Sequence, residues 1–138
     1  MYRPLIGLSL LLAACGSADE DAPEMRVVTE ATSVSLTERG RVVFKKCQTC
    51  HTLAEGDRHK VGPNLWGVFG QTAGAREDFN YSKAMAAADF GWDDTTMDGY
   101  LEKPAQYLPG GRMSFVGLNR AEDREAVIAY IKQETGAQ

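Results

Sequence analysis

Several features that define other classes of protein are missing from this chain. Its longest apolar run, from Leu5 to Ala14, is too short to cross a bilayer as a helix, which takes about 20 residues. No segment alternates apolar and polar residues as a half-buried β-strand does. The net charge of −4 provides none of the basic excess that binds nucleic acids. These absences argue against a membrane-spanning chain, a sheet protein and a nucleic-acid-binding domain.

Cysteine is also scarce, and two of the three cysteines belong to one motif, Cys47-Gln48-Thr49-Cys50-His51. Thiols three residues apart lie on one face of a helical turn, where they can form thioether bonds with the two vinyl groups of a haem. The histidine that follows can then reach the iron. A thioredoxin-type redox pair would need a βαβ pattern, and a cysteine-rich zinc site would need a second cysteine pair. Neither is present, so the motif predicts one haem c attached through Cys47 and Cys50, with His51 as an iron ligand.

The first residues have the pattern of an export signal. A cationic start precedes the apolar run, and Leu12-Ala13-Ala14-Cys15 resembles a bacterial lipobox, whose cysteine becomes a lipidated N-terminus. The alternative is an ordinary signal peptide, but Cys15 would then be a free thiol in an oxidising compartment. We therefore expect a lipoprotein signal peptide at residues 1–14 and a lipid anchor at Cys15. The protein is expected on the periplasmic side of a bacterial membrane.

Residues 15–35 have the composition of an acidic flexible tether. Five acidic residues stand against the single Arg26, Pro23 interrupts the segment, and no helical apolar face is present. A flexible chain of about 20 residues has a root-mean-square reach near 25 Å. Such a tether lets an anchored domain, expected at residues 36–138, move between neighbouring membrane complexes.

From residue 36 onward, apolar residues recur at helical spacing between Gly- and Pro-rich loops. The capping-box pattern at residues 35–38 predicts the start of a first helix. Further helices are predicted near residues 82–88 and 94–103, where Pro104 prevents continuation, followed by a short turn to Tyr107. A final helix is predicted with Asn119 as its cap. Its inward face would consist of Ala126, Val127, Tyr130 and Ile131.

The motifs from residue 36 to the C-terminus resemble class I cytochromes c of the mitochondrial and alphaproteobacterial kind. Besides the haem motif, the matching stretches are residues 59–65, 69–70, 79–82, 91–92, 100–104 and 109–115. The resemblance implies an all-α fold whose helices wrap around one covalently attached haem c. It also implies that the N- and C-terminal helices cross where Gly40, Phe44 and Tyr130 pack.

Met113 is predicted to be the second axial ligand. It follows a Pro-Gly-Gly loop, which can bring the backbone over a haem face, and its neutral thioether favours ferrous iron. A packed core methionine is the alternative interpretation. With both axial positions filled, no substrate can bind iron, which indicates an electron carrier and not an enzyme. A haem-based sensor or peroxidase-like enzyme with a labile Met113 is the alternative function, favoured only by the Gly110-Gly111 turn.

The resemblance also assigns residues around the haem. Pro63 matches the proline whose carbonyl accepts a hydrogen bond from the proximal histidine. Tyr81 and Trp92 match donors to a buried propionate, and Tyr100 matches the phenol near the axial sulfur. Simple core packing is the alternative for these three aromatic residues. The family uses the position of His59 to bond a neighbouring loop. Gly111 replaces a hydroxyl-bearing residue of the family, which predicts a looser loop.

Partners are implied only by the resemblance. The donor would be a bc-type quinol-oxidising complex, and the acceptor a terminal oxidase or a photosynthetic reaction centre. A monomer that shuttles between them and a subunit that stays docked to one oxidase are both compatible with the sequence. Five cations match family positions around the exposed haem edge and could orient docking, although scattered cations that merely solvate the surface are an equal alternative. They are Lys45, Lys46, Lys60, Arg112 and Arg120.

Overall fold

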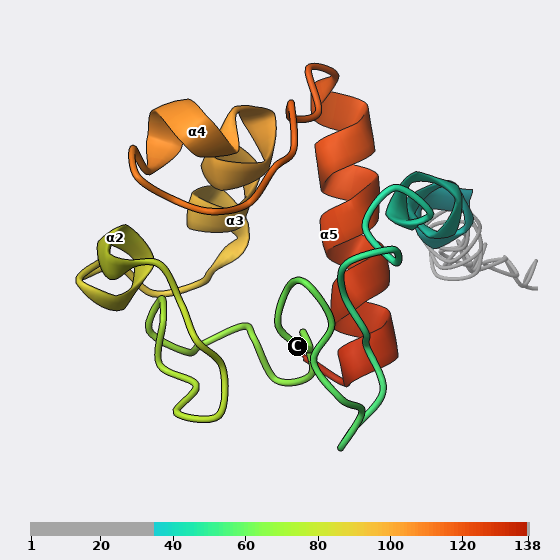
Figure 1. The fold of residues 1–138 in the computed structure, drawn as a ribbon. Coiled ribbons are helices and arrows are strands. Elements are labelled where there is room, and N and C mark those ends of the chain that lie inside the picture. Colours follow the sequence, from blue (N-terminus) through green and yellow to red (C-terminus); the bar gives the residue numbers. More distant parts are fainter. Residues whose placement is uncertain (1–34, 138) are drawn as a thin grey trace, which may run out of the picture.

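The computed structural model describes residues 35–137, and in this range the chain consists of helices and loops (Figure 1). Residues 35–44 form an N-terminal helix. It is followed by α2 (Lys83–Ala86), α3 (Asp94–Glu102), α4 (Pro104–Tyr107) and α5 (Ala121–Thr135). Extended segments pair only at an isolated bridge between Thr72 and Gly91 within the described range. The predicted all-α class is therefore confirmed.

The predicted signal peptide, the lipidated Cys15 and the tether as far as residue 34 lie outside the described residues. Among residues 35–137, no helix combines the length and the apolar character that crossing a membrane would require.

The N-terminal helix and α5 cross in direct backbone contact. A Cβ atom added at Gly40 would lie 2.0 Å from the carbonyl oxygen of Ala126 and 2.6 Å from the Cβ of Tyr130. The Phe44 and Tyr130 rings pack with their centroids 5.5 Å apart. Arg39 reinforces the crossing with a 2.7 Å ion pair to Asp123. Only glycine at position 40 allows this approach, as the resemblance implies.

On its other side, α5 packs against α3, with α4 beyond it (Figure 1). The buried guanidinium of Arg124 donates to Asp98 at 2.8 Å and to the carbonyl of Leu118 at 2.9 Å. Lys132 bonds Asp94 at 3.0 Å. The core between these helices consists of Val43, Phe44, Ala73, Trp92, Met97, Tyr100, Leu101, Leu118, Val127, Ile128 and Ile131.

The helix ends differ from the predictions at two places. Asn119 does not cap α5, because Arg120 occupies the N-cap position without a side-chain hydrogen bond, and Arg124 holds the preceding carbonyls instead. The helix capped by Ser82 is shorter than predicted and ends at Ala86, where Ala88 N–H donates to the carbonyl of Met85 in a tighter turn.

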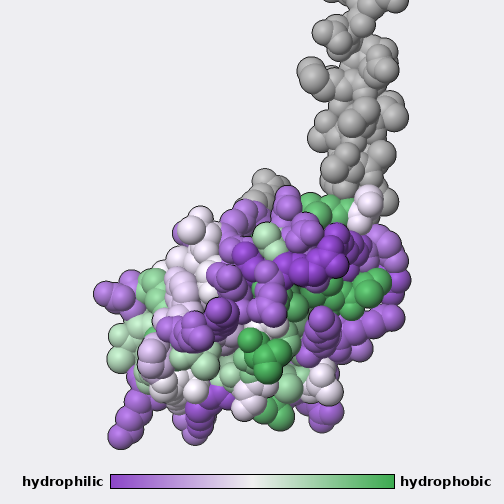
Figure 2. Space-filling view, turned by 90° about the horizontal axis from the view of Figure 1, so that it is seen from above, coloured by the Kyte–Doolittle hydropathy of each residue, from purple (hydrophilic) through white to green (hydrophobic). Residues whose placement is uncertain are grey.

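Hydrophilic side chains cover most of the face seen in Figure 2, with hydrophobic side chains between them. The large apolar residues that are most exposed in the described part of the chain are Val42, Val61, Tyr107 and Val116.

Candidate haem site

The Cys-X-X-Cys-His motif lies in turns that continue directly from the N-terminal helix. The amide groups of Cys50 and His51 both donate to the carbonyl of Cys47, each at 2.9 Å. This places the two thiols and the imidazole on one compact turn. Cys47 and Cys50 are half-buried and form no disulfide. Burial raises the pKa of the Cys47 thiol to about 11, so this thiol is protonated at neutral pH.

The imidazole of His51 is oriented by a backbone carbonyl. Its Nδ1 lies 2.7 Å from the carbonyl oxygen of Pro63, the contact that the resemblance implies. Because a carbonyl can only accept, Nδ1 carries the proton and Nε2 keeps its lone pair. Burial lowers the pKa of His51 and outweighs the Pro63 bond, which raises it, so the ring is neutral. No residue from 35 to 137 bonds to Nε2, which leaves this nitrogen available to a metal ion.

Gly62 holds the same ring from one side. A Cβ atom at this position would lie 2.4 Å from Cε1 of His51 and 2.7 Å from Nε2. The amide of Gly62 donates to the carbonyl of Cys50 at 2.8 Å, which binds the loop to the haem motif. Sequence reasoning recognised this glycine only as part of a motif. Its role depends on an approach of two backbone segments that lie 11 positions apart.

Asn64 organises the loop that carries Pro63, a role that sequence reasoning missed although the residue belongs to the motif at residues 59–65. Its side chain is 3% exposed; the amide nitrogen donates to Thr52 Oγ1 at 2.8 Å and to the carbonyl of Ala54 at 2.9 Å. Its carboxamide oxygen accepts from the amide of Trp66 at 2.8 Å. The only signal in the sequence was an asparagine within this motif, and it does not reveal which groups the side chain bonds.

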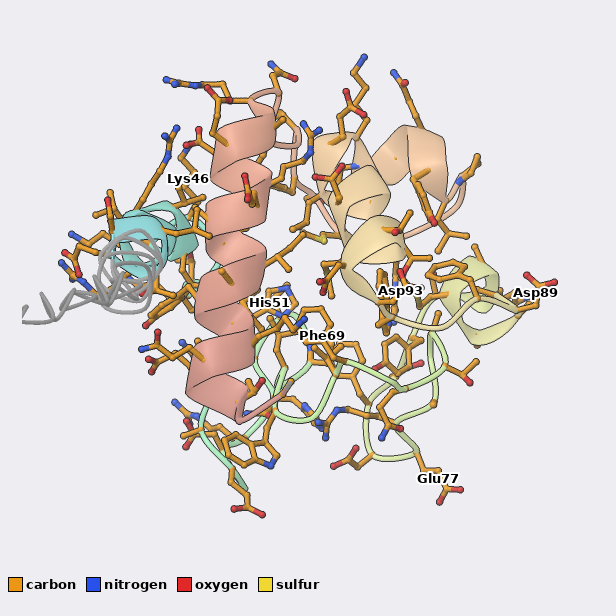
Figure 3. The ribbon with its side chains drawn as sticks, turned by 180° about the vertical axis from the view of Figure 1, so that it is seen from behind. Lys46, His51, Phe69, Glu77, Asp89 and Asp93 are labelled. Carbon is orange, nitrogen blue, oxygen red and sulfur yellow. The ribbon has the colours of Figure 1, made fainter. Side chains whose placement is uncertain are left out.

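His59 also supports this loop, as the resemblance implies. Its Nδ1 accepts from the amide of Asn64 at 2.9 Å, and its Nε2 lies 3.1 Å from Asp78 in a neighbouring loop. That hydrogen bond lowers the pKa of the Asp78 carboxyl. In Figure 3 the His51 side chain lies in the interior, whereas Glu77 and Asp89 point outward at the periphery. His59 therefore connects the loop that contains Asn64 to the loop that contains Asp78.

The Met113 loop is held more firmly than its glycines suggest. Met113 is half-buried and packs against the core. The amide of Gly111 donates to the carbonyl of Leu108 at 3.0 Å. The guanidinium of Arg112 donates to the carbonyl of Asn80, 32 positions away. This long-range bond ties the Met113 loop to the segment before Tyr81, and it restrains the loop that Gly111 was expected to loosen.

The three predicted aromatic residues form no side-chain hydrogen bond within the described range. Trp92 and Tyr100 are 9% and 5% exposed, and their ring centroids lie 5.1 Å apart. Tyr81 is half-buried and packs against Phe79. None of the three donates to a residue between 35 and 137. Burial raises the pKa of both Tyr81 and Tyr100, so their hydroxyls remain donors.

These residues fit a haem c. The chain supplies two thiols on one turn, a neutral imidazole with a free Nε2, a half-buried thioether and three donors without a protein acceptor. The indole nitrogen and the two hydroxyls of these donors are not fully enclosed, because every fully buried side-chain nitrogen or oxygen in the described range has a hydrogen-bond partner. Such donors suit the carboxylates of a propionate.

The five predicted docking cations are not equivalent. Three of them bond to the protein itself: Lys60 donates to the carbonyl of Gln48 at 2.6 Å, Arg112 to that of Asn80, and Arg120 pairs with Glu122 at 3.2 Å. Lys45 and Lys46 are exposed and have no ion pair or side-chain hydrogen bond within the described range.

Comparisons with known proteins agree with this geometry. Residues 37–135 match the family model described as Cytochrome c. A cytochrome c of Chlamydomonas reinhardtii is 44% identical over 112 residues, covering 80% of this chain and 99% of the relative. A cytochrome c2 of Afifella marina is 41% identical over 100 residues, covering 70% and 81%. A cytochrome c homolog of Rickettsia bellii is 31% identical over 138 residues, covering 96% and 80%. The chain therefore belongs to the cytochrome c family, whose members are electron carriers that bind haem c through a cysteine pair.

Proposed function

We propose that this protein is a membrane-tethered periplasmic carrier that transfers single electrons through a haem c ligated by His51 and Met113. The observation that carries the proposal is the hydrogen bond from His51 Nδ1 to the Pro63 carbonyl, which leaves Nε2 unprotonated and fixed in direction. A haem held there supplies a one-electron couple between ferrous and ferric iron.

The residues around the haem have distinct tasks in this proposal. Cys47 and Cys50 hold the group covalently, so that it is not exchanged between turnovers. The Pro63 carbonyl increases the basicity of His51 and prevents its ring from rotating. Met113 contributes a neutral, soft sulfur, which favours the ferrous state and raises the reduction potential.

Tyr81 and Trp92 would donate to a propionate of the haem, and Tyr100 would lie near the Met113 sulfur. Because Trp92 and Tyr100 are buried, they also exclude water from that side of the haem. A dry, fully ligated centre changes its charge with little rearrangement, which suits rapid electron transfer.

The location and partners follow from the sequence patterns. Lipidation at Cys15, after removal of residues 1–14, would anchor the domain at residues 36–138 through the tether at 15–35. Tethering raises the effective concentration of the carrier at its partners. A bc-type complex is the proposed donor, and a terminal oxidase or photosynthetic reaction centre the proposed acceptor. Lys45 and Lys46 support docking onto acidic partners, because both are exposed and form no ion pair or side-chain hydrogen bond within the described range.

Optical spectra of the purified full-length protein, with and without carbon monoxide, test the ligation. We expect a low-spin haem c spectrum with a methionine–iron charge-transfer band that carbon monoxide leaves unchanged. Met113→Ala is the matched control and should bind carbon monoxide. Rapid binding by the unmodified protein would contradict ligation by Met113 and favour a sensor or peroxidase-like function.

Cell fractionation tests the anchor separately. The full-length protein is expected in the membrane fraction, and Cys15→Ser in the soluble fraction with an unchanged haem spectrum. Equal distribution of the two proteins would contradict lipidation at Cys15 without affecting the proposed ligation.

A further inference from the structure

Four aromatic rings form a closed cluster on the side of α3 that faces α4. Phe90 contacts Trp92 and Tyr107, and Tyr100 contacts the same two rings, with centroid separations of 5.0, 5.5, 5.1 and 5.8 Å. All four contacts are edge-to-face, the geometry that aromatic pairs prefer. Three of the four rings are indoles or phenols, the aromatic side chains that lose an electron most readily.

The cluster connects the core to the surface. Trp92 and Tyr100 are almost fully buried, whereas Tyr107 is 39% exposed. Tyr107 reaches its place because α3 has a glycine there: a Cβ atom at Gly99 would lie 2.8 Å from Cε2 of Tyr107. Gly99 and Phe90 thus hold an exposed phenol directly against the buried Tyr100.

We propose that Tyr107 is a surface site at which peroxyl radicals take electrons from the ferrous protein, with the ring cluster as the path inward. The inference rests on the proposed function, which puts Trp92 and Tyr100 beside the haem. It adds a radical-scavenging activity at a place other than the Cys-X-X-Cys-His turn. It also needs no open position on the iron.

The chemistry balances in two steps. A peroxyl radical takes the phenolic hydrogen atom of Tyr107, so the phenol O–H bond breaks, an O–H bond forms in a hydroperoxide, and a neutral phenoxyl radical remains. The phenoxyl then gains one electron from the ferrous haem through the rings and one proton from water. This restores the phenol and leaves the iron ferric. In total, one peroxyl radical, one electron and one proton give one hydroperoxide.

Other tyrosines in the described range lack this combination of exposure and contact. Tyr100 is in the cluster but is 5% exposed, against 39% for Tyr107, so radicals in solution meet Tyr107 far more often. Tyr130 is half-buried and contacts only the Phe44 ring. Tyr81 contacts Phe79, outside the four-ring cluster.

The test exposes the ferrous full-length holoprotein to peroxyl radicals from a water-soluble azo initiator in air. Haem oxidation is followed optically, and a nitroso spin trap with peptide mass spectrometry locates tyrosyl radicals. The variants are Tyr107→Phe, which keeps the ring but removes the phenol, and Gly99→Ala, which displaces the ring. Tyr130→Phe is the matched control, and oxidation by ferricyanide, which abstracts no hydrogen atom, is measured in parallel.

We expect Tyr107→Phe to slow oxidation by peroxyl radicals severalfold, with Tyr130→Phe and the ferricyanide rates unchanged. Trapped radical on Tyr107 should be abundant in the ferric protein and scarce in the ferrous protein, where an electron repairs it. In Gly99→Ala, Tyr107 should remain trapped in both states. Equal peroxyl rates in the wild type and Tyr107→Phe, or trapping that does not depend on the iron's oxidation state, would overturn the inference. Failure of the proposed function would instead appear as carbon monoxide binding or an absent haem c spectrum.

Discussion

The helical frame and the site loops of this protein are held together in different ways. In the frame, which comprises residues 35–44, α3 and α5, backbones and apolar side chains pack directly, as at Gly40. In the site loops, which comprise residues 51–82 and 108–119, side chains bond to distant backbone carbonyls. Lys60, Arg76 and Arg112 each donate in this way. Damage to the frame should therefore reduce global stability, whereas damage to the loops should disturb the haem environment first.

The largest effect is expected from Gly40→Ala, which breaks the frame. Its new Cβ would collide with the backbone carbonyl of Ala126, which cannot move without displacing α5. We expect the free energy of unfolding in urea to fall by about 3 kcal/mol, as for severe overpacking. Gly91→Ala is the control, because its Cβ would make only an ordinary contact, 3.7 Å from the carbonyl oxygen of Gln71. Similar losses in both variants would contradict the close helix crossing.

Asn64→Ala should disturb the site loops and cause an intermediate loss of stability. The substitution removes three side-chain hydrogen bonds and leaves the Trp66 amide without its partner, whereas the Ala54 carbonyl keeps a bond from the Asp57 amide. We expect a loss of about 2 kcal/mol in urea unfolding, together with a changed spectrum of the proximal haem face. Asn80→Ala is the control, since Asn80 is exposed and contributes only its backbone carbonyl. An unchanged haem spectrum in Asn64→Ala would contradict its role in positioning Pro63.

Arg112→Gln should separate the two regions most clearly. It removes the bond to the Asn80 carbonyl, so the methionine–iron band should be lost at a lower urea concentration than helical structure. The global cost should be about 1 kcal/mol or less, as for one hydrogen bond. Lys45→Gln makes the same charge change at an exposed cation that forms no side-chain hydrogen bond within the described range, and it should leave the band intact. If Arg112→Gln lost the methionine–iron band and its helical structure at the same urea concentration, the Met113 loop would not unfold separately from the helices, which would contradict this prediction.

The smallest effect is expected at the Arg39–Asp123 ion pair of the frame. The hydrogen bond from Arg39 holds the pKa of the Asp123 carboxyl below its usual range. A depressed folded-state pKa stabilises the protein above the unfolded-state value, and this contribution is lost as pH falls through the folded-state pKa. Asp123→Asn should therefore be slightly less stable than the wild type at pH 7, on the order of 1 kcal/mol at most, and the difference should shrink toward pH 3. If the difference in unfolding free energy between the wild type and Asp123→Asn grew as the pH fell, the result would contradict a stabilising ion pair between Arg39 and Asp123.

Local patterns were sufficient for part of the site. The spacing of Cys47, Cys50 and His51 places them on one turn in any helical segment, and Pro104 ends α3 because a proline lacks an amide hydrogen. The contacts of Gly62, Asn64 and Arg124 could not be predicted in this way. Each depends on a partner from another segment, and neither helix periodicity nor turn composition contains that information. Asn119 shows the converse: it is a residue type that often caps helices, but Arg120 is the N-cap and Arg124 donates to the Leu118 and Asn119 carbonyls.

The sequence by itself determined the haem-attachment turn and the approximate helix positions, and its resemblance to class I cytochromes c implied the glycine at the helix crossing. These depend on the geometry of a few consecutive residues or on a single missing side chain. The tertiary structure alone decided which of the five cations bond to the protein itself and which carbonyls hold the Met113 loop. It also decided which tyrosine reaches the surface from the core. Lys60, Arg112 and Tyr107 look like ordinary surface residues in the chain. Their neighbours Gln48, Asn80 and Phe90 are brought to them only when the chain closes on itself.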